Sequence, residues 1–407
     1  MEKKSILNIS FFNFALVIFL AVETNFDWSQ SQVLHWGALG LLMVAYIFKD
    51  GGALDFKLHD YSWWLLGVLC LTVLSLFYGI NTSGITNLTK NFIVLLVALT
   101  MIRNHVSDSK KADSVLTAYF IATFINMVYV ITSIDASVIG NVQLGTEAIE
   151  GWNGNSIGLA ASVGAILGLY NIIKIKDWIS KIVILLISCF FVYMFVYTGS
   201  RKSIIMFVVC LLIILYATKP KAIIKNTVIT ALILCVVYNV CMNVESVYNV
   251  LGTRLEGLVA GFTGEGEVDA STESRQEYIE NGWKWIKEAP VIGYGADGYK
   301  LMNGAATGRV VYSHNNFIEI AINWGIIGFI YYYAAYLIVI KRLIKKLKNN
   351  LMNITIFSLL VVNLILHYGM VTYYDLYSNL ILCIAWALIS NSSTENKEET
   401  LDDKKIT

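Results

Sequence analysis

Apolar runs of about 15 to 20 residues recur from one end of this chain to the other, and each is long enough to span or nearly span the hydrocarbon core of a bilayer. Of the 407 residues, 57% are hydrophobic and only 14% are charged, whereas an ordinary soluble domain is about 25% charged. A soluble fold of this size has no way to bury so many long apolar segments at once. We therefore predict an all-α polytopic membrane protein.

The runs predict twelve transmembrane helices. The predicted spans are residues 6–22, 33–48, 61–79, 87–102, 114–132, 155–173, 182–198, 203–218, 223–243, 313–340, 351–368 and 373–390. They divide the chain into a nine-span bundle (1–243), a large loop (244–312), a three-span bundle (313–390) and a polar tail (391–407). The tail lacks hydrophobic periodicity, so we predict that it is disordered.

Basic residues are sorted between the two sides of this predicted bundle. With the N-terminus in the cytoplasm, 21 of the 30 Lys and Arg residues fall on the cytoplasmic side and three fall in short external loops. The other six lie in the long loop, and long loops are translocated largely regardless of charge. This pattern predicts that both termini are cytoplasmic and that the loop 244–312 is external.

The long loop has its own predicted structure. It contains ten acidic residues, six basic residues and eleven glycines, and the glycines indicate turns and close backbone approaches. The stretch STESRQEYIENGWKWIKEAP predicts a helix capped by Ser271 or Thr272. Tyr278, Trp283 and Ile286 would form its apolar face.

Three basic residues lie on the side that otherwise carries almost none: Lys90, Arg201 and Lys202. Arg201 and Lys202 occupy the short link between two apolar runs, in VYTGSRKSIIMF. They either extend toward lipid headgroups or form a fixed cation pair that holds an anion together with nearby backbone N–H groups. Lys90, in NLTKNF, is either a headgroup contact or a member of the same site.

Arg275 lies in the first turn of the predicted loop helix, where a cation opposes the helix dipole at a cost of a few tenths of a kcal/mol. It either pairs with Glu273 or Glu277, or it binds an anionic ligand near the start of the helix. Arg254 and Arg309 are further loop cations that no local pattern distinguishes.

The stretch SHNNFIEIAINWGIIGF begins the tenth predicted span with His314 and two asparagines. Glu319 lies inside the apolar run, and it shares a helical face with Asn315 at the i, i+4 spacing. An ionisable residue in a span usually faces a partner or a polar space instead of lipid, and histidine is suited to moving a proton near neutral pH. Gly325 and Gly328 would allow close packing against a neighbouring helix.

These residues together predict one external surface with cations, a histidine and a carboxylate at the level of the lipid headgroups, which suits a lipid-linked phosphate. Aromatic residues of the loop would stack on sugar rings or act as ordinary interfacial residues; they are Trp283, Trp285, Tyr294, Tyr299 and Tyr312. The six cysteines lie inside apolar runs without metal-ligand spacing, so we predict neither disulfides nor a metal site.

Three stretches resemble the O-antigen ligase and O-antigen/capsule polymerase family of polytopic glycosyltransferases. TGSRKS (198–203) resembles the family's arginine at an external helix end. SRQEYIENGWKWIKEAPVIGYGADGY (274–299) is similar to its arginine, helix, proline and GxG turn, and SHNNFIEIAINWGIIG (313–328) is similar to its histidine-asparagine, acidic residue and two glycines. At Lys202 the family commonly has a small residue, which leaves the local turn as a point of departure.

The resemblance implies transfer of a glycan from an undecaprenyl-pyrophosphate carrier to an acceptor hydroxyl on the external face of the bacterial inner or plasma membrane. It implies no cofactor, no nucleotide sugar, no required metal and no nucleic acid; a chain-length regulator and a flippase are candidate partners. Arg201 and Arg275 would bind the pyrophosphate, and His314 would orient or deprotonate the hydroxyl. Lys202, Arg254, Lys90 and Tyr294 would contact substrate, with Asn315 and Glu319 beneath His314.

The sequence also leaves other functions open. A repeat-unit polymerase and an O-antigen ligase attack the same donor and differ in acceptor, another lipid-linked repeat unit or a molecule such as lipid A core; we favour the polymerase. Twelve spans with both termini inside are also common in secondary transporters, but transporters place ionisable residues at the membrane midplane, often in two similar halves. A non-catalytic partner in polysaccharide export is a further alternative.

Overall fold

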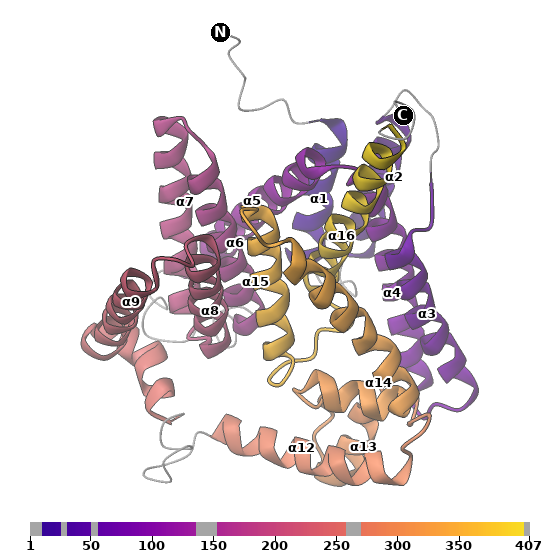
Figure 1. The fold of residues 1–407 in the computed structure, drawn as a ribbon. Helices are drawn as coiled ribbons and strands as arrows, with labels where there is room; N and C mark the ends of the chain where they lie inside the picture. Colours follow the sequence, from indigo (N-terminus) through magenta and orange to yellow (C-terminus); the bar gives the residue numbers. More distant parts are fainter. Residues whose placement is uncertain (1–9, 26–30, 50–55, 136–152, 258–269, 403–407) are drawn as a thin grey trace.

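The computed structural model describes residues 10–25, 31–49, 56–135, 153–257 and 270–402, and all regular elements within these ranges are helices. Figure 1 shows them as a helical bundle with two helices, α12 and α13, lying across one end. The main helices are α1 (Phe11–Asn25), α2 (Gln32–Phe48), α3 (Asp60–Leu74), α4 (Thr82–His105), α5 (Ser109–Thr132), α6 (Gly154–Lys174), α7 (Trp178–Tyr197), α8 (Arg201–Thr218), α9 (Ile223–Asn243), α10 (Glu245–Val247), α12 (Ala270–Glu288), α13 (Gly298–Thr307), α14 (Asn316–Leu343), α15 (Leu351–Leu366) and α16 (Leu376–Asp402).

The prediction of an all-α polytopic membrane protein is confirmed. Within the described residues, eight helices are long and apolar enough to cross a bilayer, and four further apolar helices of 10–17 residues accompany them. Each of the twelve ranges predicted from the sequence overlaps one of these helices. The eight long segments are Asp60–Phe77, Thr82–His105, Ser109–Thr132, Gly154–Lys174, Trp178–Tyr197, Arg201–Thr218, Ile223–Asn243 and Asn316–Lys346.

Short polar residues set where several of these helices begin. The side chain of Asn81 accepts a hydrogen bond from the backbone N–H of Gly84 at the start of α4, and Asp108 accepts from Lys110 and Lys111 at the start of α5. Such caps satisfy N–H groups that have no partner inside the helix. The sequence thus marks helix starts even where apolar runs follow one another closely.

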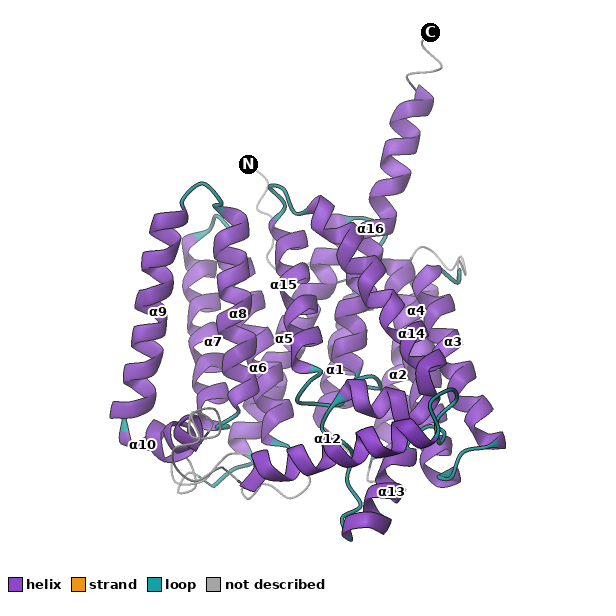
Figure 2. Cartoon of the chain, turned by 60° about the horizontal axis from the view of Figure 1, so that its bottom comes forward, coloured by secondary structure: helices purple, strands orange, loops and turns teal. Residues whose placement is uncertain are grey.

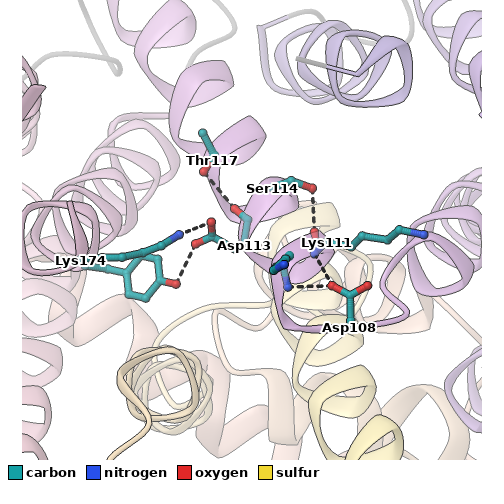
Figure 3. A network of polar contacts seen from close by, with 8 residues as sticks. Asp108, Lys111, Asp113, Ser114, Thr117 and Lys174 are labelled. Atoms are coloured by element: carbon teal, nitrogen blue, oxygen red, sulfur yellow. Dashed lines mark hydrogen bonds and ion pairs between the residues drawn. The ribbon is translucent and has the colours of Figure 1, made fainter. Parts of the chain in front are cut away.

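A polar network joins α5 to α6 at the end of the bundle where α5 begins (Figure 3). Asp113 on α5 forms an ion pair with Lys174, the last residue of α6, and accepts a hydrogen bond of 2.8 Å from the Tyr170 hydroxyl. The cation of Lys174 also suits the negative end of the α6 dipole. This network holds α5 and α6 together at that end of the bundle, and it includes none of the candidate site residues.

The predicted loop helix is confirmed as α12, which lies with α13 across one end of the bundle (Figures 1 and 2). It begins at Ala270, so Ser271 lies within its first turn and does not precede it. Tyr278 and Gly282 are buried, whereas Trp283 is 55% exposed, so the prediction that Trp283 belongs to the apolar face is wrong. Its position is five residues after Tyr278, about 140° around a helix of 3.6 residues per turn.

Helix α14 is broken at Gly325, which has φ 62° and ψ −162°. The loop before α13 replaces the missing helical bonds: Tyr294 N–H donates to the Ile322 carbonyl at 2.8 Å, and Ile326 N–H donates to the Pro290 carbonyl at 2.9 Å. A Cβ at Gly325 would lie 2.2 Å from the carbonyl carbon of Val291. The predicted close packing at this glycine is therefore present, but it comes with a break that was not predicted.

The atoms that lie nearest to Gly328 belong to its own helix. The three atoms nearest to a Cβ built at Gly328 all belong to Trp324, one turn earlier in the same helix. The break at Gly325 lets the first half of α14 lie beside α12 and α13, while the second half rises into the bundle (Figure 1).

The C-terminal segment also differs from its prediction. Helix α16 continues to Asp402, so residues 391–402 are helical instead of disordered, and residues 403–407 lie outside the described part of the chain. The stretch contains good helix formers such as Glu and Lys. A helix that is already nucleated in the bundle gains one hydrogen bond for each further residue it fixes, so it can propagate without an apolar face.

Candidate functional site

Three segments that are distant in sequence meet at the end of the bundle covered by α12. They are the start of α8, the first half of α12 and the turn that precedes α14 (Figure 2). Arg275 on α12 and Lys202 on α8 are both close enough to His314 to act on its charge. The structure thus brings together three of the residues that the sequence singled out.

The turn before α14 holds His314 in a defined conformation. His314 has φ 55°, a left-handed value that is uncommon for residues other than glycine. The carboxylate of Glu319 accepts a hydrogen bond of 2.8 Å from the Ser313 backbone N–H. The side chain of Asn315 accepts from the N–H groups of Phe317 and Ile318 and thereby caps α14.

These contacts give Asn315 and Glu319 a clear structural role. Glu319 is 1% exposed, and its carboxylate contacts the backbone on the N-terminal side of His314. Asn315 acts on the C-terminal side as the N-cap of α14. Both residues therefore hold the strained turn that presents the His314 imidazole.

The imidazole of His314 lies between two tyrosine rings. Its ring centroid is 4.2 Å from that of Tyr312 and 5.9 Å from that of Tyr278, which is stacked on it with an interplanar angle of 15°. His314 precedes α14 and so lies outside the membrane-spanning helix. Burial, then the positive charges of Arg275 and Lys202, lower its pKa to about 4. The imidazole is consequently neutral at neutral pH and can accept a proton.

Arg275 reaches the site because of helical spacing. It lies three residues before Tyr278, so both side chains share one face of α12. Tyr278 is itself fixed, since its carbonyl accepts a hydrogen bond of 2.9 Å from the buried Tyr299 hydroxyl on α13. The helix pair α12–α13 therefore orients the face that carries Arg275.

The start of α8 depends on a glycine and a pair of arginines. Gly199 has φ 60°, and a Cβ there would lie 2.6 Å from the Val250 carbonyl oxygen. Arg254 donates to the Gly199 carbonyl at 3.1 Å, and Arg201 donates to the Arg254 carbonyl at 3.2 Å. Arg254 therefore stabilises the turn that precedes Arg201.

Arg201, Lys202 and Arg275 form the cation cluster of this site, and Lys202 is its least expected member. Its side chain is only 9% exposed, and Arg275 and Arg201 both act on its charge. In the part of the chain that the structure describes, the Lys202 ammonium has no hydrogen bond and no ion pair. Its Cε lies 3.3 Å from the position of a Cβ built on Gly369, in the connector between α15 and α16. A buried cation beside two more cations is costly unless an anion joins them.

Tyr294 and Lys90 lie elsewhere. The Tyr294 hydroxyl donates to Glu288 at 3.0 Å, while its backbone pairs with the broken α14. Lys90 is exposed on α4, and the next residue, Asn91, donates to the Tyr374 carbonyl at 3.0 Å. Among the described contacts, none joins either side chain to His314, Arg275 or Lys202.

Arg309 also lies apart from the cluster. It is exposed, its guanidinium donates to the Ser274 hydroxyl at 3.5 Å, and the cations that act on the charge of His314 are Arg275 and Lys202. No local pattern distinguishes Arg309 from Arg254, although only Arg254 was predicted to contact substrate. In the structure, Arg254 contacts the turn at Gly199 and Arg309 contacts Ser274.

Sequence reasoning missed two parts of the site. Tyr312 was named among the loop aromatics and Tyr278 was predicted on the apolar face of the loop helix, but their ring contacts with His314 depend on tertiary structure. The connector of residues 367–375 falls where the predicted spans 351–368 and 373–390 meet, so it was not recognised as a separate segment. Its only local signal was its polar content within an apolar region.

Comparison with known proteins gives one family match. Residues 183–333 match the family described as O-antigen ligase. No curated protein matches the chain. The matched region contains Arg201, Arg275, His314 and Glu319, and it confirms the family resemblance drawn from the sequence.

Proposed function

We propose, from the premise that residues 183–333 form an O-antigen ligase region within a polytopic membrane protein, that the chain polymerises oligosaccharide repeat units linked to undecaprenyl pyrophosphate. The reaction would take place on the external face of the bacterial cell membrane. The observation that carries this proposal is the largely buried Lys202 side chain, which has no hydrogen bond or ion pair among the described residues and lies close to Arg275 and the neutral His314.

The cation cluster suits a pyrophosphate leaving group. Arg275 and Lys202 approach from different helices, and Arg201 begins α8, where backbone N–H groups and the helix dipole also favour an anion. Fixed cations strengthen their interaction as negative charge develops on the departing pyrophosphate. Arginine can in addition bind phosphate oxygens with two parallel hydrogen bonds.

The position of His314 suits activation of an acceptor hydroxyl. In the transfer, the hydroxyl oxygen forms a bond to the anomeric carbon, and the bond from that carbon to the pyrophosphate oxygen breaks with its electron pair. The hydroxyl proton passes to a ring nitrogen of His314. Binding of the anionic donor would offset the positive charges of Arg275 and Lys202, so it raises the pKa of His314 and makes the imidazole a better base.

The charge pattern of the sequence supports a site on the external face of the membrane, with both termini in the cytoplasm. A lipid-linked donor assembled in the cytoplasm would have to be supplied by a flippase. A chain-length regulator would act on the polymer that the site releases. The Tyr278 and Tyr312 rings beside His314 could contact sugar rings of the acceptor.

The test is transfer by purified protein in liposomes, with a lipid-linked repeat unit as donor. We expect long-chain product from the wild-type protein and its loss in Arg201→Gln, Arg275→Gln and His314→Gln, whereas Arg309→Gln retains activity because Arg309 lies outside the cluster. Activity should survive EDTA. Normal product from well-folded His314→Gln and Arg275→Gln proteins would contradict the proposed site.

The same assay distinguishes polymerase from ligase through the acceptor. A polymerase extends one lipid-linked repeat unit with another and needs no further substrate. An O-antigen ligase, the function named in the family description, produces product only when a different acceptor such as lipid A core is added. Transport of a labelled solute without glycan product would instead support the transporter alternative.

A further inference from the structure

Asn316, the first residue of α14, is completely buried and forms an unusual number of hydrogen bonds. Its side-chain oxygen accepts from the backbone N–H groups of Thr372 at 2.9 Å and Tyr373 at 3.0 Å. Its side-chain nitrogen donates to the Tyr333 hydroxyl at 3.0 Å and approaches Nδ1 of His367 at 3.4 Å. Its backbone N–H donates to the His367 carbonyl at 2.8 Å.

These bonds fasten the connector between α15 and α16 to the start of α14. The connector is bound at both of its sides, at His367 and at Thr372–Tyr373, and Gly369 between them lies against the Lys202 side chain. His314 lies two residues before Asn316. One buried side chain therefore links the turn that carries His314 to the backbone against which Lys202 packs.

His367 does not act as a second base in this arrangement. It is completely buried, and its imidazole is surrounded by the rings of Phe317, Tyr333 and Tyr336. Because the Asn316 amide can only donate from its nitrogen, Nδ1 of His367 serves as the acceptor. His367 thus contributes to the fastening of the connector.

We propose that Asn316 is a positioning residue of the transfer site, which sets the distance between His314 and Lys202 through the connector of residues 367–373. This rests on the proposed function for its catalytic consequence. His367, Thr372 and Tyr373 lie outside the region 183–333 that matches the family, so the proposal adds a segment of the chain to the site. A displacement of about 1 Å between reacting groups can reduce a rate by about 100-fold.

The test compares Asn316→Leu with Asn353→Leu. Asn353 is also a buried asparagine, and its side chain donates to the Lys346 carbonyl. It lies near the start of α15, whereas the connector follows the end of α15. We expect Asn316→Leu to lower kcat per folded molecule by at least about tenfold and to raise KM for the donor, while Asn353→Leu changes neither. Asn316→Asp, which keeps the oxygen that accepts from Thr372 and Tyr373, should recover part of the activity.

Equal kcat and KM in the two leucine variants would overturn the proposal, and so would an aspartate variant no better than the leucine variant. If Asn316→Leu does not fold, Tyr333→Phe removes one partner of Asn316 with little change in packing. It should lower kcat several-fold, and an unchanged kcat would refute the positioning role.

A second measurement separates this proposal from the proposed function. Inorganic pyrophosphate should raise the melting temperature of the wild-type and Asn353→Leu proteins, because it binds the cation cluster. It should have little effect on Asn316→Leu. If the wild-type protein transfers no glycan but this difference is found, the proposed function is wrong and the positioning role stands; if all three proteins respond alike, the positioning role is wrong.

Discussion

Replacing Arg275 with glutamine should shift the acid limb of the pH profile of kcat/KM to a higher pH. Arg275 is one of two cations that, after burial, lower the pKa of His314 to about 4. Removal of that cation makes the imidazolium less unfavourable, so the pKa rises toward the ordinary value of about 6.5. The neutral base is then lost at a higher pH, and kcat/KM declines earlier as the pH falls.

The size of this change follows from the geometry. Arg275 lies one helical turn before Tyr278, whose ring centroid is 5.9 Å from that of His314, and its charge acts on the imidazole. A nearby charge commonly shifts a pKa by about one unit or more, and one pKa unit corresponds to about 1.4 kcal/mol. Because burial is the larger cause and remains, we expect a limb near about pH 5 and not at 6.5.

The assay measures kcat/KM for the lipid-linked donor between about pH 3.5 and 8, in steps of about half a pH unit. After each exposure to acid, activity is measured again at about pH 7 to exclude unfolding. Arg275→Lys keeps the charge and should keep the wild-type limb, although its rate falls. Arg309→Gln removes an exposed cation outside the cluster and should also keep it. The reasoning is refuted if Arg275→Gln leaves the limb in place, or if Arg309→Gln moves it equally.

Two further predictions concern Lys202 and Gly325. Lys202→Met should raise KM for the donor by about tenfold, since one charged contact is lost. It should also raise the melting temperature of the donor-free protein by about 2 °C, because a largely buried cation close to Arg275 and Arg201 is removed; a lower melting temperature would contradict this reasoning. Gly325→Ala should destabilise the protein by about 2 kcal/mol or more, because its φ of 62° is unfavourable for alanine and its Cβ would meet Val291. The control is Gly40→Ala, where a Cβ meets no atom within 4 Å, and thermal melting in detergent should show no loss there.

Much of the fold could be predicted from the sequence because membrane helices depend on local composition. Runs of apolar residues must satisfy their backbone groups internally, so their length predicts helices directly. The helix α12 was predicted for a similar reason, from its periodicity and the proline beyond its end. The extension of α16 to Asp402 was missed because a helix that continues from the bundle needs no apolar periodicity of its own.

The site was predicted in part. His314, Arg275 and Lys202 each departed from the surrounding pattern, as a histidine at a helix start, a cation in the first turn of the predicted loop helix and a cation on the sparsely charged side. Such departures can be detected in one sequence, and the structure brings all three together. The interactions between them could not be detected, because Tyr278 and the connector reach the site only through tertiary packing.

The difference between Asn315 and Asn316 shows this limit at neighbouring positions. Both are asparagines at the start of an apolar run, and either could have been the helix cap. Asn315 accepts from backbone N–H groups of its own helix, a local role that sequence reasoning can predict. Asn316 accepts from Thr372 and Tyr373, more than fifty residues later, and no local pattern indicates such a partner.

The break in α14 bears on the choice between an enzyme and a transporter. Broken membrane helices in transporters expose backbone carbonyls that coordinate ions near the middle of the membrane. Here the carbonyls of Ile322 and Asn323 at the break are occupied, because they accept from the N–H groups of Tyr294 and Gly295. The consequence of the break is instead geometric, because the first half of α14 lies beside α12 (Figure 1). His314 immediately precedes this half-helix and is close enough to Arg275 for that cation to act on its charge. The break therefore takes part in packing at the candidate site, which favours the proposed transfer site over a transporter's ion site.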